Sequence, residues 1–250
     1  MAQADVALGL DVGGSSIKYA PVDTRTGQLL ASLASSPTPR PATAGNMLDA
    51  LVTLAQMQPP GTPVGVALPS VIRRGVIHTA ANLHPSLIGV DGQAVLTQRL
   101  ARPVVLLNDA DAAGIAEMHA GAARGVVGTV MLLTFGTGIG SALFIDGRLV
   151  PNTELGHMEV GGVEGELYAS ARVRSELALG WEDWALRVNA YLAMIERLFW
   201  PELIVIGGGV SEHYGQFGPL LRSRAELRVA QYGAAAGAVG AALAAAGRDS

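Results

Sequence analysis

Cysteine is absent from the 250-residue sequence, so the chain forms neither a disulfide framework nor a thiolate metal site. No apolar run approaches the ~20 residues that a membrane span needs, and the N-terminus lacks the features of a signal peptide. Lys18 is the only lysine, and a net charge of −4 argues against a general nucleic-acid surface. A chain that is 50% hydrophobic can still enclose one or two cores. These features predict a cytoplasmic protein that binds neither membranes nor nucleic acids.

Two segments repeat one pattern, in which an apolar strand, a turn of glycines and hydroxyls and a second apolar strand follow one another. The copies are Leu8–Lys18 and Leu132–Ser141. The step from Asp11 to Asp23 equals the step from Thr134 to Asp146. Glycine lets the backbone approach a ligand closely and turn its N–H groups toward it. Two such hairpins predict two facing walls of a phosphate-binding cleft.

The spacing of apolar residues predicts an α/β chain in two similar halves. Strands are expected at residues 6–10, 17–22, 28–33, 64–68, 104–107, 129–135, 141–145, 148–150 and 203–206, and helices at 47–55, 109–120, 166–177, 181–199 and 234–246. Residues 35–41, rich in serine and proline, are predicted to be a loop. The domains are expected to be an N-terminal lobe over 1–108, a C-terminal lobe over 109–233, and a tail helix over 234–250 that packs back on the first lobe.

The first candidate site is Asp11 with the turn that follows it. A carboxylate at a strand end beside a glycine turn can hold Mg²⁺, directly or through water, while backbone N–H groups hold phosphate. The alternative is a plain hairpin turn, and neither copy of the pattern is a P-loop. A run of glycines at residues 207–209 after a strand is a weaker candidate for the same chemistry, because such runs often mark only a tight turn.

The second candidate is the pair Asn108 and Asp109, which follows a buried strand and opens a helix. The helix dipole favours an ionised carboxylate there, and such a carboxylate can accept the proton of a substrate hydroxyl during phosphoryl transfer. On spacing alone, a helix cap without catalysis is the favoured interpretation of the pair.

The third candidate is Glu154 with His157, which could face one ligand if their segment is helical. Carboxylate and imidazole together suit a polyol, because they offer both acceptors and a donor. A metal site is the rival interpretation, and two ligands without cysteine make it weak. The glutamates at 159, 164 and 166 are expected to be mostly solvated.

Six segments in this order resemble the ROK family of sugar kinases, in the actin/hexokinase-like (ribonuclease H-like) ATPase superfamily, and most closely its polyphosphate glucokinase branch. The segments lie at residues 10–18, 78–83, 107–113, 133–143, 146–157 and 206–211. The resemblance covers essentially the whole chain. It implies two α/β lobes around a cleft that holds the sugar.

The resemblance also implies the roles of individual residues. Asp109 matches the general base that takes the proton from the sugar 6-hydroxyl. Sugar contacts are implied for Asn82, Asn108, Asp109, Glu154, His157 and Glu166. Asp11 matches the Mg²⁺ position, with the metal held through water. Phosphate or nucleotide contacts are implied for Gly13, Gly14, Ser15 and Lys18, for Thr134, Gly136, Thr137 and Gly138, and for Gly207, Gly208 and Gly209.

Some positions depart from the family pattern. Most members carry a zinc site of one histidine and several cysteines; a chain without cysteine excludes that site, and its absence is typical of the polyphosphate branch. Ser70 stands where the family usually has glycine, Leu87 lacks a neighbouring tryptophan, and the segment after Ser211 lacks the lysines of polyphosphate users. These departures leave the donor open between polyphosphate and ATP. The sugar stays open between glucose and mannose for another reason, because the two differ only in the orientation of one hydroxyl.

The function expected from the sequence is therefore a Mg²⁺-dependent glucokinase that uses polyphosphate, ATP or both, and that forms a homodimer. The alternative is a ROK-like sugar-binding regulator or scaffold without kinase turnover.

Overall fold

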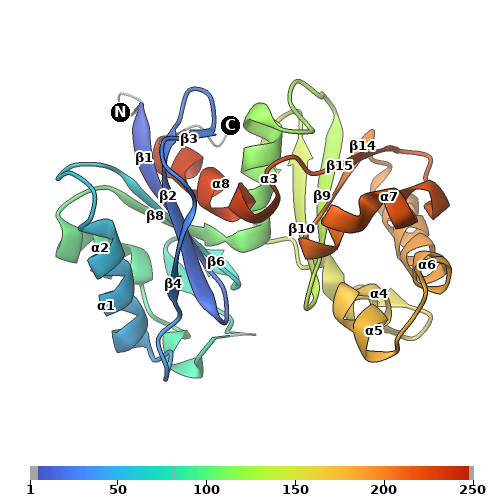
Figure 1. Ribbon diagram of the computed structural model, residues 1–250, viewed down its shortest axis with the longest axis horizontal. Helices are drawn as coiled ribbons and strands as arrows, with labels where there is room; N and C mark the ends of the chain where they lie inside the picture. The colour runs from blue at the N-terminus through green and yellow to red at the C-terminus, as the bar shows by residue number, and fades with distance from the viewer. Residues whose placement is uncertain (1–4, 81–82, 248–250) are drawn as a thin grey trace. The chain divides into compact units, whose positions relative to one another are not determined.

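The computed structural model describes residues 5–80 and 83–247 and divides the chain into two compact units (Figure 1). The first unit holds the chain up to Ala120 together with the tail from Ala235 onward, and the second holds Gly121–Ala234. Each unit is built on its own β-sheet. Within the described ranges, no helix combines the length and the apolar character needed to cross a bilayer.

The sheet of the first unit has the strand order β3-β2-β1-β5-β8, and β4 also pairs with β2. Its strands are β1 (Val6–Val12), β2 (Ser16–Asp23), β3 (Gln28–Leu29), β4 (Ala34–Pro37), β5 (Val64–Leu68) and β8 (Val104–Asn108). β1 and β2 form an antiparallel hairpin, whereas β5 runs parallel to both β1 and β8. A separate ribbon joins β6 (Ile72–Arg73) to β7 (Val76–Ile77). β5 is buried along its whole length, which explains its uninterrupted apolar sequence.

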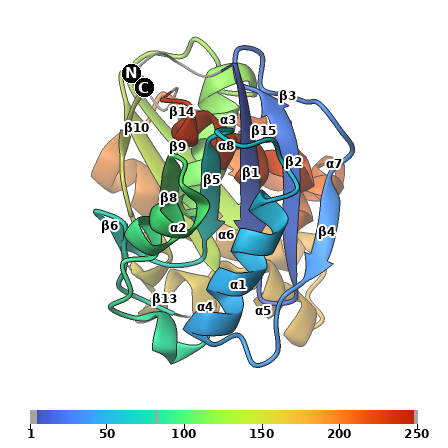
Figure 2. The same ribbon diagram turned by 90° about the vertical axis from the view of Figure 1, so that its left-hand side faces the viewer.

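Helices cover both faces of this sheet. Figure 2 shows α1 (Ala44–Ala55) and α2 (Gly92–Leu100) on one face, and α3 (Asp109–Ala120) and α8 (Ala236–Ala245) behind the sheet on the other. Strand alternation divides β1 between the two layers: Leu8 and Leu10 join the core under α1, whereas Gly9 faces α8. A short 3₁₀ turn, η1 (Pro85–Leu87), precedes α2.

Helix α8 packs unusually closely because small residues line its contacts. A Cβ on Gly9 or Gly65 would overlap the backbone carbonyl of Ala238 or Ala241 in α8. Likewise, a Cβ on Gly240 would overlap the carbonyl of Ala112 in α3. All residues of α8 from Ala236 to Ala244 are buried, so the alanine- and glycine-rich tail is a core helix rather than a linker.

The sheet of the second unit has the strand order β11-β10-β9-β14-β15. Its strands are β9 (Thr129–Phe135), β10 (Ile139–Ile145), β11 (Arg148–Val150), β14 (Leu203–Gly207) and β15 (Glu226–Val229), and a small ribbon joins β12 (Glu159–Val160) to β13 (Val163–Glu164). The helices are α4 (Gly165–Ala169), α5 (Ala171–Glu176), α6 (Trp181–Phe199) and α7 (Tyr214–Phe217), with 3₁₀ turns η2 (Leu155–His157), η3 (Gly209–His213) and η4 (Gly218–Leu220). A last 3₁₀ turn, η5 (Gly233–Ala235), leads into α8. Phe135 of β9 makes edge contacts with Trp184 and Tyr191 of α6, and these rings form the centre of the core.

Most predicted elements are confirmed, with three corrections. The segment predicted as a loop overlaps β4, an edge strand whose half-exposed residues carry no apolar pattern. The strand predicted to reach residue 33 ends at Leu29. The helix predicted over 166–177 is two helices, because Ser170 ends α4 and its hydroxyl accepts the N–H of Val173 to begin α5.

The expected boundary between residues 108 and 109 lies at the start of α3, whereas the compact first unit continues to Ala120. The tail helix α8 lies within that first unit and contacts β1 and β5.

The two hairpins of the repeated pattern differ in register. In the first, Val12 pairs with Ile17, so four residues form the turn; in the second, Phe135 pairs with Ile139, so three residues do. Gly14 and Ser15 lie exposed at the tip of the first turn. Equal spacing in the sequence therefore does not produce equal pairing, and the second turn is the tighter one.

Candidate functional site

Asn108 and Asp109 stand where β8 ends and α3 begins. The Asn108 carboxamide oxygen accepts the N–H groups of Ala110, at 2.8 Å, and Asp111, at 3.1 Å, so Asn108 caps the helix. Its amide nitrogen donates to the Ser70 carbonyl at 3.2 Å. These bonds hold a residue that is only 7% exposed and leave one amide hydrogen for a ligand. The structural role of Asn108 is therefore to cap α3 and to bind the Ser70 carbonyl.

Asp109 follows as the first residue of α3, half-buried, with its carboxylate accepting the N–H of Ala110 at 2.9 Å. The N-terminus of a helix stabilises a negative charge by its dipole and by unpaired N–H groups. Asp109 therefore lies where its ionised form, the form that can accept a proton, is favoured.

Asp11 lies one residue before the end of β1 and pairs in register with Lys18 of β2. A Cβ on Gly237 would lie 2.6–2.8 Å from the carboxylate atoms of Asp11, so this side chain rests on the first turn of α8. Burial raises the pKa of Asp11, and the positive charge of Lys18 partly offsets the rise. A carboxylate in this position gains from a further cation nearby.

The first hairpin turn, residues 13–16, is tied to the segment after β4. Gly13 donates its N–H to the Ser16 carbonyl at 2.9 Å. The buried Thr38 donates its hydroxyl to the Gly13 carbonyl at 2.6 Å and its N–H to the Ser15 carbonyl at 3.1 Å. Thr38 thereby provides hydrogen-bond donors for two carbonyls of the turn. Sequence reasoning missed Thr38, because it lies in the segment that was predicted to be a loop.

The second hairpin turn, residues 136–138, is braced by the start of α5 and by a carboxylate. Gly136 donates its N–H to the Gly138 carbonyl, and Arg172 donates its backbone N–H to the Gly136 carbonyl, each at 3.0 Å. A Cβ on Gly138 would overlap the carboxylate of Glu166, so glycine at 138 leaves room for that side chain. The structure thus brings Glu166 and the second turn together.

The run of three glycines lies beside the same turn. Gly207 pairs in parallel with Thr134, the residue two before Gly136. Gly208 has a φ of 83° and lies against the backbone of Phe135, where a Cβ would come within 2.6 Å of the Phe135 nitrogen. Of the sites predicted within the second unit, the second turn and the glycine run therefore lie side by side.

Glu154 precedes the 3₁₀ turn η2 and His157 is its last residue; the turn is anchored to β10. The Ser141 hydroxyl accepts the N–H of Leu155 at 3.1 Å and donates to the Thr153 carbonyl at 2.5 Å. Gly156 lies against the carbonyl of Ile139, where no Cβ would fit. The segment is therefore helical as the third candidate required, although it forms one 3₁₀ turn.

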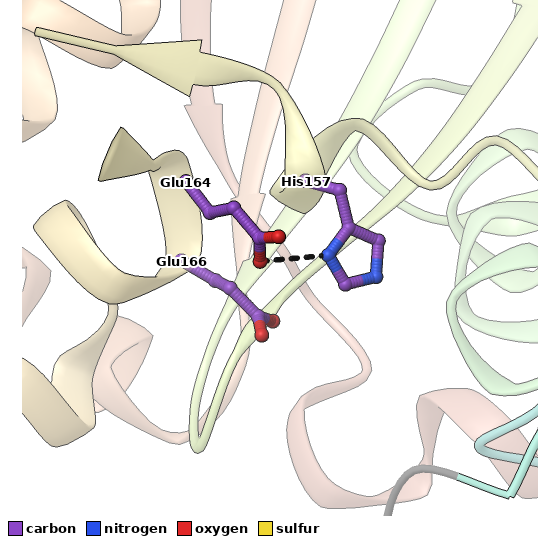
Figure 3. A group of neighbouring side chains, drawn as sticks. All are labelled: His157, Glu164 and Glu166. Carbon is purple, nitrogen blue, oxygen red and sulfur yellow. Dashed lines mark hydrogen bonds and ion pairs between the residues drawn. The ribbon is translucent and has the colours of Figure 1, made fainter. Parts of the chain in front are cut away.

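The imidazole of His157 lies beside two glutamates (Figure 3). Its Nδ1 is 3.0 Å from Oε2 of Glu164. One ligand atom from each of His157, Glu164 and Glu166 lies within 4.8 Å of the others, so the group could also hold a metal ion. The hydrogen bond to Glu164 raises the pKa of His157; the carboxylate of Glu166 acts in the same direction. Desolvation raises the pKa of Glu154, against the effect of the nearby His157 ring.

Glu164 is the residue of this group that sequence reasoning set aside as solvated. The signal that could have found it is the Gly161-Gly162 pair between two valines. Both glycines have positive φ, 65° and 88°, as a tight hairpin turn requires. The turn folds β13 back on β12 and returns Glu164 to His157. Asn82, the remaining predicted sugar contact, lies outside the described residues.

Comparison with known proteins gives matches over nearly the whole chain. The model of the ROK family matches residues 7–168. The polyphosphate glucokinase of Mycobacterium tuberculosis (strain CDC 1551 / Oshkosh) is 43% identical over 237 residues, which are 94% of this chain and 89% of that protein.

Two solved structures extend the likeness to three dimensions. The inorganic polyphosphate/ATP-glucomannokinase from Arthrobacter sp. strain KM is 43% identical and superimposes with a TM-score of 0.91, over 97% of this chain and 99% of that one. A ROK family glucokinase from Streptomyces griseus, solved in complex with glucose and AMPPNP, is 26% identical with a TM-score of 0.74, over 95% and 98% of the two chains. These matches confirm the predicted fold class.

Proposed function

The chain belongs to the ROK family, and from this premise we propose that it is a glucokinase, which transfers a phosphoryl group from polyphosphate, ATP or both to the 6-hydroxyl of glucose. The observation that carries the proposal is the 43% identity, across nearly the full length of both chains, to a polyphosphate glucokinase and to a polyphosphate/ATP-glucomannokinase. The names of these relatives support both the sugar and the two donors.

Asp109 is the proposed general base. The 6-hydroxyl oxygen attacks the terminal phosphorus of the donor, its proton passes to the Asp109 carboxylate, and the bond from phosphorus to the bridging oxygen breaks. The shortened donor leaves with the electron pair of that bond. The place of Asp109 at the N-terminus of α3 supports this role, because the helix favours the ionised carboxylate before the proton arrives.

Sugar contacts are proposed for Asn82, Asn108, Glu154, His157 and Glu166. Glu154, His157 and Glu166, which belong to the second unit, support this role together. Carboxylates accept hydrogen bonds from sugar hydroxyls and a protonated imidazole donates one, so the set matches the mixed character of a polyol. Asn108 would add its one remaining amide hydrogen.

The donor phosphates are proposed to bind the glycine turns: Gly13, Gly14, Ser15 and Lys18 in the first unit, and Thr134, Gly136, Thr137, Gly138 and Gly207, Gly208, Gly209 in the second. The turns can offer backbone N–H groups, and Thr38 donates hydrogen bonds to two carbonyls of the first turn. Lys18 adds the positive charge that an anionic donor needs.

Mg²⁺ is the proposed cofactor, with Asp11 as its ligand through water. One carboxylate fits an ion that keeps most of its water shell and shares its remaining contacts with phosphates. The raised pKa of Asp11 supports the assignment, since a half-buried carboxylate gains from a second cation besides Lys18. When bound, Mg²⁺ would offset the negative charge of the donor phosphates.

A coupled assay for glucose 6-phosphate, run separately with polyphosphate and with ATP, tests the proposal, and mannose in place of glucose tests the sugar. Formation of product with either donor supports it, and no product with either refutes it. Calorimetric glucose binding without turnover would instead favour the sugar-binding scaffold. The homodimer and the cytoplasmic location remain predictions, the first open to light scattering in solution.

The assigned base has its own test. Asp109→Asn keeps the size of the side chain and removes its basicity, so we expect kcat to fall by ~10²–10⁴, the usual worth of general-base catalysis, while glucose still binds. Asp183→Asn is the matched control, because Asp183 is an exposed acid in the first turn of α6. Full activity of the Asp109 variant would remove Asp109 from this role.

A further inference from the structure

The hydrogen bond between His157 and Glu164 joins a proposed sugar contact to a residue with no assigned role (Figure 3). The two side chains are 57% and 45% exposed. An ion pair so open to solvent contributes little to folding stability, because water screens the charges. Folding stability therefore does not account for the contact between His157 and Glu164, and a role in the site does.

The position of Glu164 is set by the core beneath it. Gly165, the next residue, donates its N–H to the Met158 carbonyl at 2.8 Å. A Cβ on Gly165 would come within 2.7 Å of the Tyr191 ring, which is itself fully buried against Phe135. The glycine thus lets the start of α4 lie directly on the aromatic core. The packing of Gly165 therefore fixes the backbone beside Glu164, while the Glu164 carboxylate extends away from the core.

Three carboxylates face His157, and they come from three elements: Glu164 from β13, Glu166 from α4 and Glu154 from the residue before η2. Of these, Glu164 forms the hydrogen bond to the ring, through Nδ1. The other ring nitrogen, Nε2, is not used by that bond. Fixing one nitrogen of a histidine determines what the other offers to a ligand.

We propose that Glu164 is a positioning residue for His157: it holds the ring through Nδ1 so that Nε2–H of the protonated imidazole donates to a hydroxyl of the bound sugar. This inference rests on the proposed function. Glu164 does two separable things in it. Its oxygen atom orients the ring, and its charge keeps the ring protonated to higher pH, because a hydrogen-bonded carboxylate raises the pKa of His157.

Two substitutions separate the two effects. Glu164→Gln retains an acceptor for Nδ1–H and removes the charge, whereas Glu164→Ala removes both. Glu159→Gln is the matched control, because Glu159 is an exposed acid that pairs with Glu164 across the β12–β13 ribbon and is not one of the groups that face His157. The measurements are kcat and KM for glucose as functions of pH.

The pH profile has a definite sign. Because the protonated ring is the donor, KM for glucose rises as pH increases through the pKa of His157. In Glu164→Gln that pKa is lower, so the rise in KM begins at lower pH than in the wild type, while KM in more acidic solution stays close to the wild-type value. NMR titration of the His157 ring, one of five histidines, reports the same shift directly.

In Glu164→Ala we expect KM for glucose to increase about three- to tenfold across the pH range, as the loss of one orienting hydrogen bond predicts. We expect kcat to change less than about twofold, because a residue that acts through ground-state binding affects KM. Circular dichroism and thermal unfolding establish that each variant is folded. If the alanine variant does not fold, the glutamine variant and its NMR titration still decide the question.

A double-mutant cycle shows whether Glu164 acts through His157. In a His157→Asn background, Glu164→Ala should raise KM no further, since the ring it orients is gone. Additive effects would mean that Glu164 contacts the sugar itself, and would overturn the inference. So would a Glu164→Ala profile that matches Glu159→Gln. Absence of kinase activity in the wild type would refute the proposed function instead, which keeps the two failures distinct.

Discussion

Replacing Gly240 of α8 by alanine is expected to destabilise the protein, although alanine is the better helix former. Propensity alone predicts a gain of about 1 kcal/mol for a glycine-to-alanine change inside a helix. The structure predicts the opposite sign. A Cβ at this position would overlap the backbone carbonyl of Ala112 and lie 3.0 Å from its Cα. Backbone atoms of α3 cannot rotate away as the end of a side chain can.

The size of the effect follows from what must move. Overpacking a well-packed core costs roughly 1–3 kcal/mol when side chains can adjust, and here two helices must separate instead. Since α8 is buried from Ala236 to Ala244, separation would loosen its contacts with α3 and with the sheet. We therefore expect a net loss of about 3 kcal/mol or more after the gain in propensity, relative to wild type. For a chain of this size, that lowers Tm by roughly 6–12 °C.

Urea and thermal unfolding measure the change, with Gly45→Ala as the control. Gly45 also lies in a helix, α1, but it is exposed and a Cβ there would meet no atom within 4 Å. We expect this control to be neutral or to gain up to about 1 kcal/mol. Equal effects of the two substitutions, or a more stable Gly240→Ala protein, would refute the close-packing argument.

Three further predictions follow from individual contacts. Thr38→Val removes the hydroxyl that holds the first hairpin turn. We expect KM for the phosphoryl donor to rise about two- to tenfold, while KM for glucose stays unchanged. Thr53→Val, at an exposed threonine, is the control, and an equal effect of that variant would contradict the prediction. Tyr191→Phe removes a buried hydroxyl that has no hydrogen-bond partner among the described residues. The free energy of unfolding should therefore stay equal or rise by up to about 1 kcal/mol. A clear loss of stability would mean that the hydroxyl has a partner. Burial would raise the pKa of Glu196, but hydrogen bonds from the segment at residues 223–225 outweigh it and lower that pKa below its usual 4.5. Glu196→Gln should therefore destabilise the protein at pH 7, and the difference in stability from the wild type should shrink as pH falls below about 4.5. A difference independent of pH would contradict the assignment.

Elements with strong local patterns were predictable from the sequence. Helix α6 has the expected bounds, because its apolar face repeats at helical spacing and Pro201 follows its end. β9 and β11 also have the expected bounds. β4 was not predictable in this way. As an edge strand with half-exposed residues, it is held by pairing with β2 rather than by an apolar pattern of its own.

In the candidate site too, some features were predictable from the sequence and others were not. Asn108 and Asp109 could be placed at a helix start from the sequence, because capping is a local property. The contact between His157 and Glu164 could not, because it depends on a two-residue turn and on the packing of Gly165 against a ring far along the chain. Thr38 was missed for a similar reason, since its partners lie in the turn between β1 and β2, more than 20 residues earlier in the chain.

Residue type and near-neighbour spacing were enough to identify the family, most of the strands and helices, and the residues chemically able to form a site. Which of those residues touch depends on the tertiary structure. It shortened the second hairpin turn despite equal sequence spacing, set Asp11 against the first turn of α8, and turned Glu164 from an expected surface charge into the partner of His157. Such contacts depend on packing between segments distant in the chain, and no local pattern encodes them.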